Sequence, residues 1–210
     1  MKIGSREFDF GRHTYIMGIL NVTPDSFSDG GKFNQIDAAL KHAEEMIRDG
    51  ADVIDIGGES TRPGHTPVSA EEEAARVVPV IEALRKRFDV PISVDTYKGS
   101  VADAAVQAGA DLVNDVWGLK YDPEMAPVIA RYQAPCCLMH NKDNTEYNNF
   151  IVDMLAETQE CVNIAKRAGI ADDKIILDPG VGFGKTYEMN LMTMDNLELF
   201  RKLGYPVLLG

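Results

Sequence analysis

The sequence predicts an α/β protein of parallel strands and crossover helices, and among such folds it fits a (β/α)8 TIM-type barrel. Short β-branched segments alternate with longer amphipathic segments along the whole chain. The predicted strands are apolar almost throughout, as expected when both faces of a sheet are covered. Because no linker, repeat or low-complexity tract interrupts the pattern, residues 1–210 are expected to form a single domain.

Seven strands are predicted, at 15–20, 53–56, 92–94, 112–114, 135–139, 175–177 and 206–209. Helices are predicted between them, at 36–49, 70–88, 100–108, 123–132, 150–168 and 186–203. Ser69 and Glu72 have the spacing of a capping box before the second helix. A barrel of this type closes with eight strands over about 250 residues. We therefore expect a barrel truncated after its seventh strand, with a helix, a strand and a helix missing. An open, doubly wound sheet is the competing architecture.

Composition disfavours several classes of function. The chain has 21 Lys and Arg against 33 Asp and Glu, a formal charge of −12. This acidic excess argues against binding to nucleic acid or to an anionic membrane surface. The apolar run 15–20 is too short for a membrane span or a signal peptide core. Cys136, Cys137 and Cys161 are interpreted as buried thiols in a reducing compartment, so we expect a cytoplasmic protein.

Polar side chains follow most of the predicted strands at their carboxyl ends. They are Asn21, Asp55, Asp95, Asn114, Asp115, His140, Asn141 and Asp178, and Gly-rich loops follow the first two strands. Capping of the next helix explains any one of these residues about as well as a functional role does. Together they favour a polar ring at the carboxyl-end mouth of the barrel, where loops from every strand converge.

These residue types suit a flat nitrogen heterocycle that carries a phosphate-bearing arm. Carboxylates accept hydrogen bonds from N–H groups, and an amide both donates and accepts. Asp95, Asn114 and Asp178 therefore suit an edge like that of an aminopyrimidine. Arg62 has the fork geometry of an anion clamp, and Asn21 offers an oxygen to a hard cation such as Mg²⁺. The Gly-rich stretch that ends at Lys185 lacks the spacing of a nucleotide P-loop, and Lys185 adds a cation to the mouth.

Three long segments, 18–31, 50–64 and 178–185, resemble the dihydropteroate synthases. Shorter matches at 94–98, 113–118 and 138–141 follow in the same order. The resemblance implies a folate-pathway (β/α)8 barrel that is usually a homodimer. It implies an enzyme that joins p-aminobenzoate to a hydroxymethyl-dihydropterin diphosphate and releases diphosphate.

The resemblance also implies roles for individual residues. Asp95, Asn114 and Asp178 would hold the pterin edge, and Asn21 would bind Mg²⁺. The other substrate-side positions are Phe27 and Asp29 in the first loop, Thr61 and Arg62 at the diphosphate, Met139 in the pterin pocket, and Phe183 beside the aminobenzoate slot. Lys185, the cation near that loop, is also counted as substrate-binding.

The mechanism implied by the resemblance is dissociative. Diphosphate leaves with the help of Mg²⁺ and cations, and the aniline nitrogen attacks the cationic pterin methylene. Asp95 and Asp178, as anions, would stabilise that cation, with Asp29 also counted as catalytic, while the mobile loops exclude water.

Two alternatives stay open beside that reading. A pterin-dependent methyltransferase shares the barrel and the pterin-holding residues, but it needs neither loop 21–31 nor the contacts of Thr61 and Arg62. A non-catalytic pterin-binding fragment is the other, because the family's Ser-Arg-Lys segment and its Arg-x-His pair have no counterpart in these 210 residues. We expect residues 1–210 alone to be inactive or unstable, because the seventh strand would be an unpaired edge of the sheet.

Overall fold

The computed structural model of the protein describes residues 1–23, 32–59 and 67–210. Six parallel strands form one sheet in chain order. They are β3 (Met17–Asn21), β4 (Val53–Gly57), β5 (Ile92–Asp95), β6 (Leu112–Asp115), β7 (Cys136–Met139) and β8 (Ile175–Asp178). Because the order never reverses, the sheet has no switch point of the doubly wound kind, and the predicted barrel topology is confirmed over these strands.

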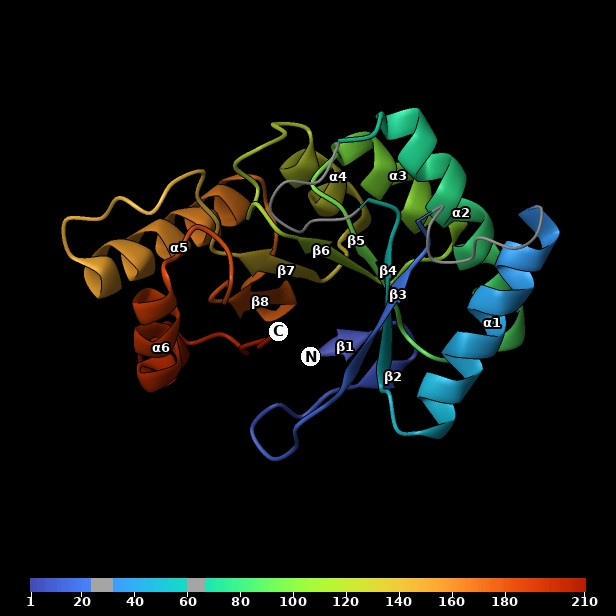
Figure 1. Cartoon of the computed structure of the whole chain (residues 1–210), viewed down its shortest axis with the longest axis horizontal. Coiled ribbons are helices and arrows are strands. Elements are labelled where there is room, and N and C mark those ends of the chain that lie inside the picture. The colour runs from blue at the N-terminus through green and yellow to red at the C-terminus, as the bar shows by residue number, and fades with distance from the viewer. Residues whose placement is uncertain (24–31, 60–66) are drawn as a thin grey trace.

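The helices lie between the strands and cover one side of the sheet (Figure 1). They are α1 (Lys32–Arg48), α2 (Ala70–Arg87), α3 (Gly99–Ala108), α4 (Met125–Tyr132), α5 (Phe150–Arg167), α6 (Tyr187–Asp195) and α7 (Leu197–Arg201). The amide of Glu72 donates to Ser69 Oγ at 3.2 Å, so the predicted cap of α2 is confirmed. The prediction of a single helix over 186–203 is wrong. The helix is broken at Asn196, whose side chain donates to the carbonyl of Met192. Within the described residues, no helix is long and apolar enough to cross a membrane.

The segment predicted as a seventh strand, 206–209, pairs with β8 through a single parallel bridge from Leu177 to Val207. The Leu177 amide donates to the Pro206 carbonyl and the Leu208 amide to the Leu177 carbonyl, both at 2.9 Å. The prediction was therefore correct in position and wrong in extent. The N-terminal hairpin was not predicted: β1 (Lys2–Ile3) pairs antiparallel with β2 (Arg6–Glu7).

Two apolar clusters lie on opposite faces of the sheet. The outer cluster packs the strands against the helices, and the inner cluster fills the N-terminal end of the barrel beneath the hairpin. Cys136 belongs to the outer cluster and Cys137 to the inner one, as adjacent residues of a strand should. All three cysteines are buried free thiols, so the predicted burial of these side chains is confirmed.

The outer cluster predicts where a small truncation destabilises the fold. Val77 of α2 is fully buried, whereas Val152 of α5 is 59% exposed. Val77→Ala should lower the free energy of unfolding by about 2 kcal/mol, because it removes buried methyl groups and leaves a cavity. Val152→Ala is the matched control and should change it by less than about 0.5 kcal/mol. Urea denaturation measures both, and equal effects would contradict the packing described here.

Candidate active site

Side chains alternate along each strand, so every second residue points into the barrel. Within the sheet, Asn21 is in register with Gly57, Gly57 with Asp95, and Asp95 with Asn114. Asp178 stands opposite Met139, further toward the carboxyl ends. Above the inner apolar cluster, the inward positions therefore change from apolar to polar toward the carboxyl ends of the strands.

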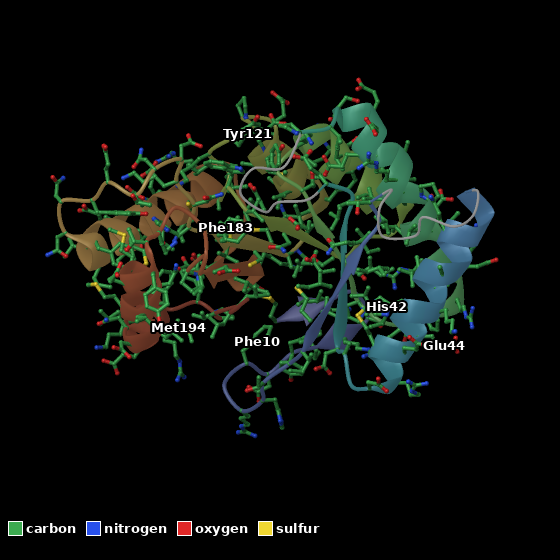
Figure 2. The ribbon with its side chains drawn as sticks, viewed as in Figure 1. Phe10, His42, Glu44, Tyr121, Phe183 and Met194 are labelled. Atoms are coloured by element: carbon green, nitrogen blue, oxygen red, sulfur yellow. The ribbon has the colours of Figure 1, made fainter. Side chains whose placement is uncertain are left out.

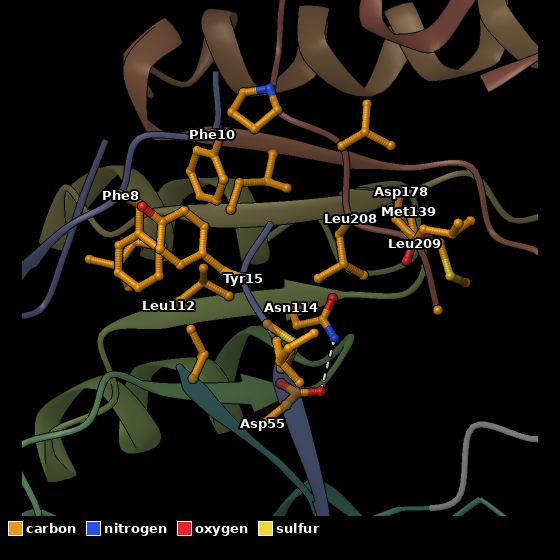
Figure 3. A pocket seen from close by; sticks show the side chains of 18 of the residues that line it. Phe8, Phe10, Tyr15, Asp55, Leu112, Asn114, Met139, Asp178, Leu208 and Leu209 are labelled. Carbon is orange, nitrogen blue, oxygen red and sulfur yellow. Dashed lines mark hydrogen bonds between the residues drawn. The ribbon is translucent and has the colours of Figure 1, made fainter. Parts of the chain in front are cut away.

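These polar residues line one cavity of about 1210 Å³ that runs along the inside of the sheet. Figure 3 shows Asp55, Asn114, Met139 and Asp178 toward one end of it and the aromatic rings of the N-terminal segment toward the other. Of the residues predicted to bind substrate or metal, the structure brings together Asn21, Asp95, Asn114, Met139, Asp178 and Phe183 as lining residues. Phe27, Asp29, Thr61 and Arg62 lie outside the described residues.

The carboxylates of Asp55 on β4 and Asp95 on β5 have oxygens that are available to accept hydrogen bonds. Asn114 Nδ2 donates to Asp55 Oδ2 at 3.1 Å (Figure 3). Among the described residues, Asp55 Oδ1 and Asp95 Oδ1 are buried without a hydrogen-bond partner. A buried acceptor without a partner is destabilising, and native proteins retain it mainly at functional sites. The base of the cavity therefore has acceptors available for N–H groups of a ligand.

Burial controls the protonation of these acids. It raises the pKa of Asp55 and, together with the negative charge of Asp55, raises the pKa of Asp95 well above its usual range. The negative charge of Asp55 thus disfavours ionisation of Asp95. Burial also raises the pKa of Asp178, to about 6, although the amide of Gly180 donates to its Oδ1 at 2.7 Å and Lys185 opposes the shift. At neutral pH, Asp178 is thus more readily ionised than Asp95.

Lys185 lies behind Asp178 and is not among the residues that line the cavity. Its ammonium donates to the carbonyls of Gly180 and Phe183, at 2.8 and 2.9 Å, and to Nδ1 of His140 at 3.0 Å. The His140 ring is fully buried, and its Nε2 lies 2.8 Å from Glu157 Oε2. The structure therefore places the predicted substrate lysine in an internal network.

The rim of the cavity is apolar and aromatic. Met139 and Phe183 both line it, and both belong to a cluster with Tyr97, Val116 and Trp117. Figure 2 shows Phe183 and Phe10 at different ends of the interior. A flat ring that donates hydrogen bonds to the acids would have its faces against this rim.

Three residues of the site were not assigned a role from the sequence. Asp55 has a visible signal, because it stands at a strand end like Asp95, although no motif gave it a function. Glu157 has none, since it is one of several polar residues on α5. Glu59 accepts from Tyr97 OH at 2.6 Å, from the Val68 amide at 3.2 Å and from Lys98, which also binds Glu73. Such contacts between distant segments leave no local pattern in the sequence.

The fold and the cavity are those of a parallel α/β barrel with a polar site at the carboxyl ends of its strands. The chain belongs to the pterin binding enzyme family, whose sequence model matches residues 17–210. The dihydropteroate synthase of Clostridium beijerinckii is 65% identical over 100% of this chain and 78% of that protein. That of Bacillus subtilis is 61% identical over 94% of this chain and 69% of that protein.

Solved structures agree with this assignment. A Clostridium difficile dihydropteroate synthase, determined with pteroic acid, superposes with a TM-score of 0.95 at 52% identity, over 97% of this chain and 78% of that one. A Xanthomonas albilineans dihydropteroate synthase with 7,8-dihydropteroate gives a TM-score of 0.87 at 39% identity, over 97% and 74%. The predicted family and the predicted barrel fold are thereby confirmed.

The raised pKa of Asp178 predicts a pH-dependent loss of stability. Unfolded aspartates titrate near pH 4. Since the folded protein releases the Asp178 proton only at about pH 6, the ionised carboxylate destabilises the fold above that pH, and the effect fades as the pH falls toward 4. Asp178→Asn keeps an acceptor for Gly180 and should raise the unfolding free energy at pH 8 by about 1–3 kcal/mol.

Urea denaturation at pH 4 and pH 8 checks this prediction. Asp143→Asn, in an exposed loop, is the matched control and should leave both values unchanged. A gain from Asp178→Asn that is the same at the two pH values, or larger at pH 4, would contradict the assigned burial of the charge.

Proposed function

We propose that the site of this chain serves the dihydropteroate synthase reaction, which joins p-aminobenzoate to a hydroxymethyl-dihydropterin diphosphate with release of diphosphate. The observation that carries the proposal is the set of buried acceptors at the base of the cavity. Asp55 and Asp95 each have an oxygen without a partner among the described residues, beside Asn114. The aminopyrimidine edge of a pterin presents N–H donors and an acceptor, which match carboxylates and an amide.

The acids also have the charge that a dissociative substitution needs. A cation that develops on the pterin methylene is stabilised by fixed negative charge in a water-poor cavity. Asp178 supplies it more readily than Asp95, because the charge of Asp55 disfavours ionisation of Asp95. Hydrogen bonds from the pterin to Asp95 would favour its ionised form. Phe183 on the rim supports the aminobenzoate slot proposed for it, and Phe27, Asp29, Thr61 and Arg62 keep their predicted roles as proposals.

Mg²⁺ is proposed as the cofactor, with Asn21 as its protein ligand. A Cβ atom at Gly57 would lie 3.3 Å from Asn21 Oδ1 and 3.6 Å from Asp95 Oδ2, so the glycine keeps the space between these oxygens open. The described residues contain no cluster of three carboxylate, histidine or cysteine ligands. This fits Mg²⁺, which keeps several waters and takes phosphate oxygens as ligands. When bound, it would neutralise charge on the diphosphate.

A homodimer and residence in the cytoplasm complete the proposal. The dimer is supported by apolar side chains exposed on one helix, α6, which are Tyr187, Leu191, Met192 and Met194. Met194 is labelled in Figure 2. The cytoplasm is supported by the three free thiols, because reducing compartments keep cysteines unpaired.

Diphosphate release is the direct test of the reaction. The purified protein is given the dihydropterin diphosphate and Mg²⁺, with and without p-aminobenzoate. Release that requires p-aminobenzoate, with formation of dihydropteroate, supports the proposal. Pterin binding that is indifferent to the diphosphate and yields no product would instead support a non-catalytic binder, and methyl transfer from a methylated pterin would support a methyltransferase.

Asp95→Asn tests the recognition of the pterin. Because it replaces a carboxylate that accepts from N–H groups, the dissociation constant of a hydroxymethyl-pterin should rise at least about tenfold, as expected for a hydrogen bond worth about 1.5–3 kcal/mol. Isothermal titration calorimetry measures it. Asp173→Asn, at an exposed position, is the control and should bind like the parent protein. A change of less than about twofold for Asp95→Asn would exclude this role.

A further inference from the structure

We propose that Glu157, His140 and Lys185 form a relay that positions the 180–185 loop and the Asp178 carboxylate, so that Lys185 acts as a positioning residue and not as a substrate ligand. The inference rests on the proposed function in that the pterin and p-aminobenzoate are the molecules whose binding the relay would serve. It assigns Lys185 a different role from the one the sequence suggested.

The first argument is the use of the ammonium donors. A lysine ammonium has three N–H groups. Lys185 directs them at the carbonyls of Gly180 and Phe183 and at Nδ1 of His140, at 2.8, 2.9 and 3.0 Å. No donor is left for a phosphate or a carboxylate of a substrate unless one of these bonds is broken.

The second argument is the state of the histidine. An ammonium cannot accept a hydrogen bond, so Nδ1 of His140 must be the acceptor, and Nε2–H then donates to Glu157 at 2.8 Å. Burial, reinforced by the charge of Lys185, lowers the pKa of His140 to about 4, so the ring is neutral. Burial raises the pKa of Glu157, but hydrogen bonds from His140 and Lys142 outweigh it and lower that pKa on balance. The relay thus runs from an anion through a neutral ring to a cation.

The third argument is what the ammonium holds. By bonding the carbonyls of Gly180 and Phe183, Lys185 closes the loop on itself beside the end of β8. A Cβ atom at Gly180, which has φ +65°, would lie 2.1 Å from the His140 carbonyl oxygen, so the loop is pressed against the segment after β7. Tyr147 OH donates to the Gly184 carbonyl at 2.8 Å and fixes its far side. The position of the Phe183 ring on the cavity rim follows from these contacts.

The fourth argument is electrostatic. Lys185 faces Asp178 from β8, Glu157 from α5 and Lys120 from the loop after β6, besides His140. Burial lowers the pKa of Lys185 to about 8, while the two acids oppose that shift. In return, the ammonium opposes the rise in the pKa of Asp178. The relay therefore keeps Asp178 ionised near neutral pH without a hydrogen bond to it.

Lys185→Met tests the relay, with Lys86→Met as the control at an exposed position of α2. We expect the acid limb of pterin binding, measured by calorimetry between pH 5 and 8, to move to higher pH by about one unit, because Asp178 loses a nearby cation. We also expect KM for p-aminobenzoate to rise about tenfold while kcat falls less, because the Phe183 loop is released. Lys185→Arg should restore part of the acid-limb shift, and Glu157→Gln should shift it in the same direction by a smaller amount.

Two results would overturn the relay. One is an unchanged acid limb and an unchanged KM for p-aminobenzoate in Lys185→Met. The other is a loss confined to the affinity for inorganic diphosphate, since that would make Lys185 a substrate ligand.

A measurement on the parent protein protects the test against a misfolded variant. Nitrogen-15 NMR of His140 should show the neutral Nε2–H tautomer at pH 7, and an imidazolium there would equally contradict the relay. If the parent protein released no diphosphate, the proposed function would fail, yet pterin binding and the His140 spectrum would still decide the relay.

Discussion

The alternation of side chains along parallel strands is the constraint on which the rest of the structure depends. Helices cover the outer face of the sheet, so one residue in two must be apolar to fill that layer. The intervening residues face the interior of the barrel. There they are apolar at Val53 and Leu112 and polar two residues later at Asp55 and Asn114. Each of these strands thereby contributes residues to the outer core, to the inner apolar cluster and to the polar site.

Two of the buried carboxylates each have an oxygen without a hydrogen-bond partner among the described residues. Burial without a full set of hydrogen bonds destabilises Asp55 and Asp95 and raises their pKa values. The surrounding sheet tolerates them because its outer face is densely packed and each strand is hydrogen-bonded to its neighbours. Because these acceptors are already desolvated, a hydrogen bond from a pterin N–H adds little further desolvation cost on the protein side. The stability that the free protein loses by burying them is therefore recovered as binding affinity.

Much of this could be predicted from the sequence, because strands, helix caps and polar strand ends are local patterns. The level shared by Asp95 and Asn114 follows from strand period and order alone. The hairpin at residues 2–7 was missed because its strands are two residues long, and the break at Asn196 because side-chain bonding competes with the helix there. Glu157 could not be found, since its partner His140 is brought to it only by the packing of α5 on β7.

The position of Glu157 shows how the outer layer acts on the interior. A cation that contacts the leaving diphosphate directly would also bind the product and slow its release. Lys185, with its donors bonded to protein carbonyls and to His140, acts on Asp178 only through its charge, and in a poorly solvated interior charge acts over several ångströms. The carbonyls that it binds belong to the loop carrying Phe183, so the same ammonium that favours an ionised Asp178 also fixes the apolar rim. Lys185 in this way couples the position of the apolar rim to the ionisation of Asp178.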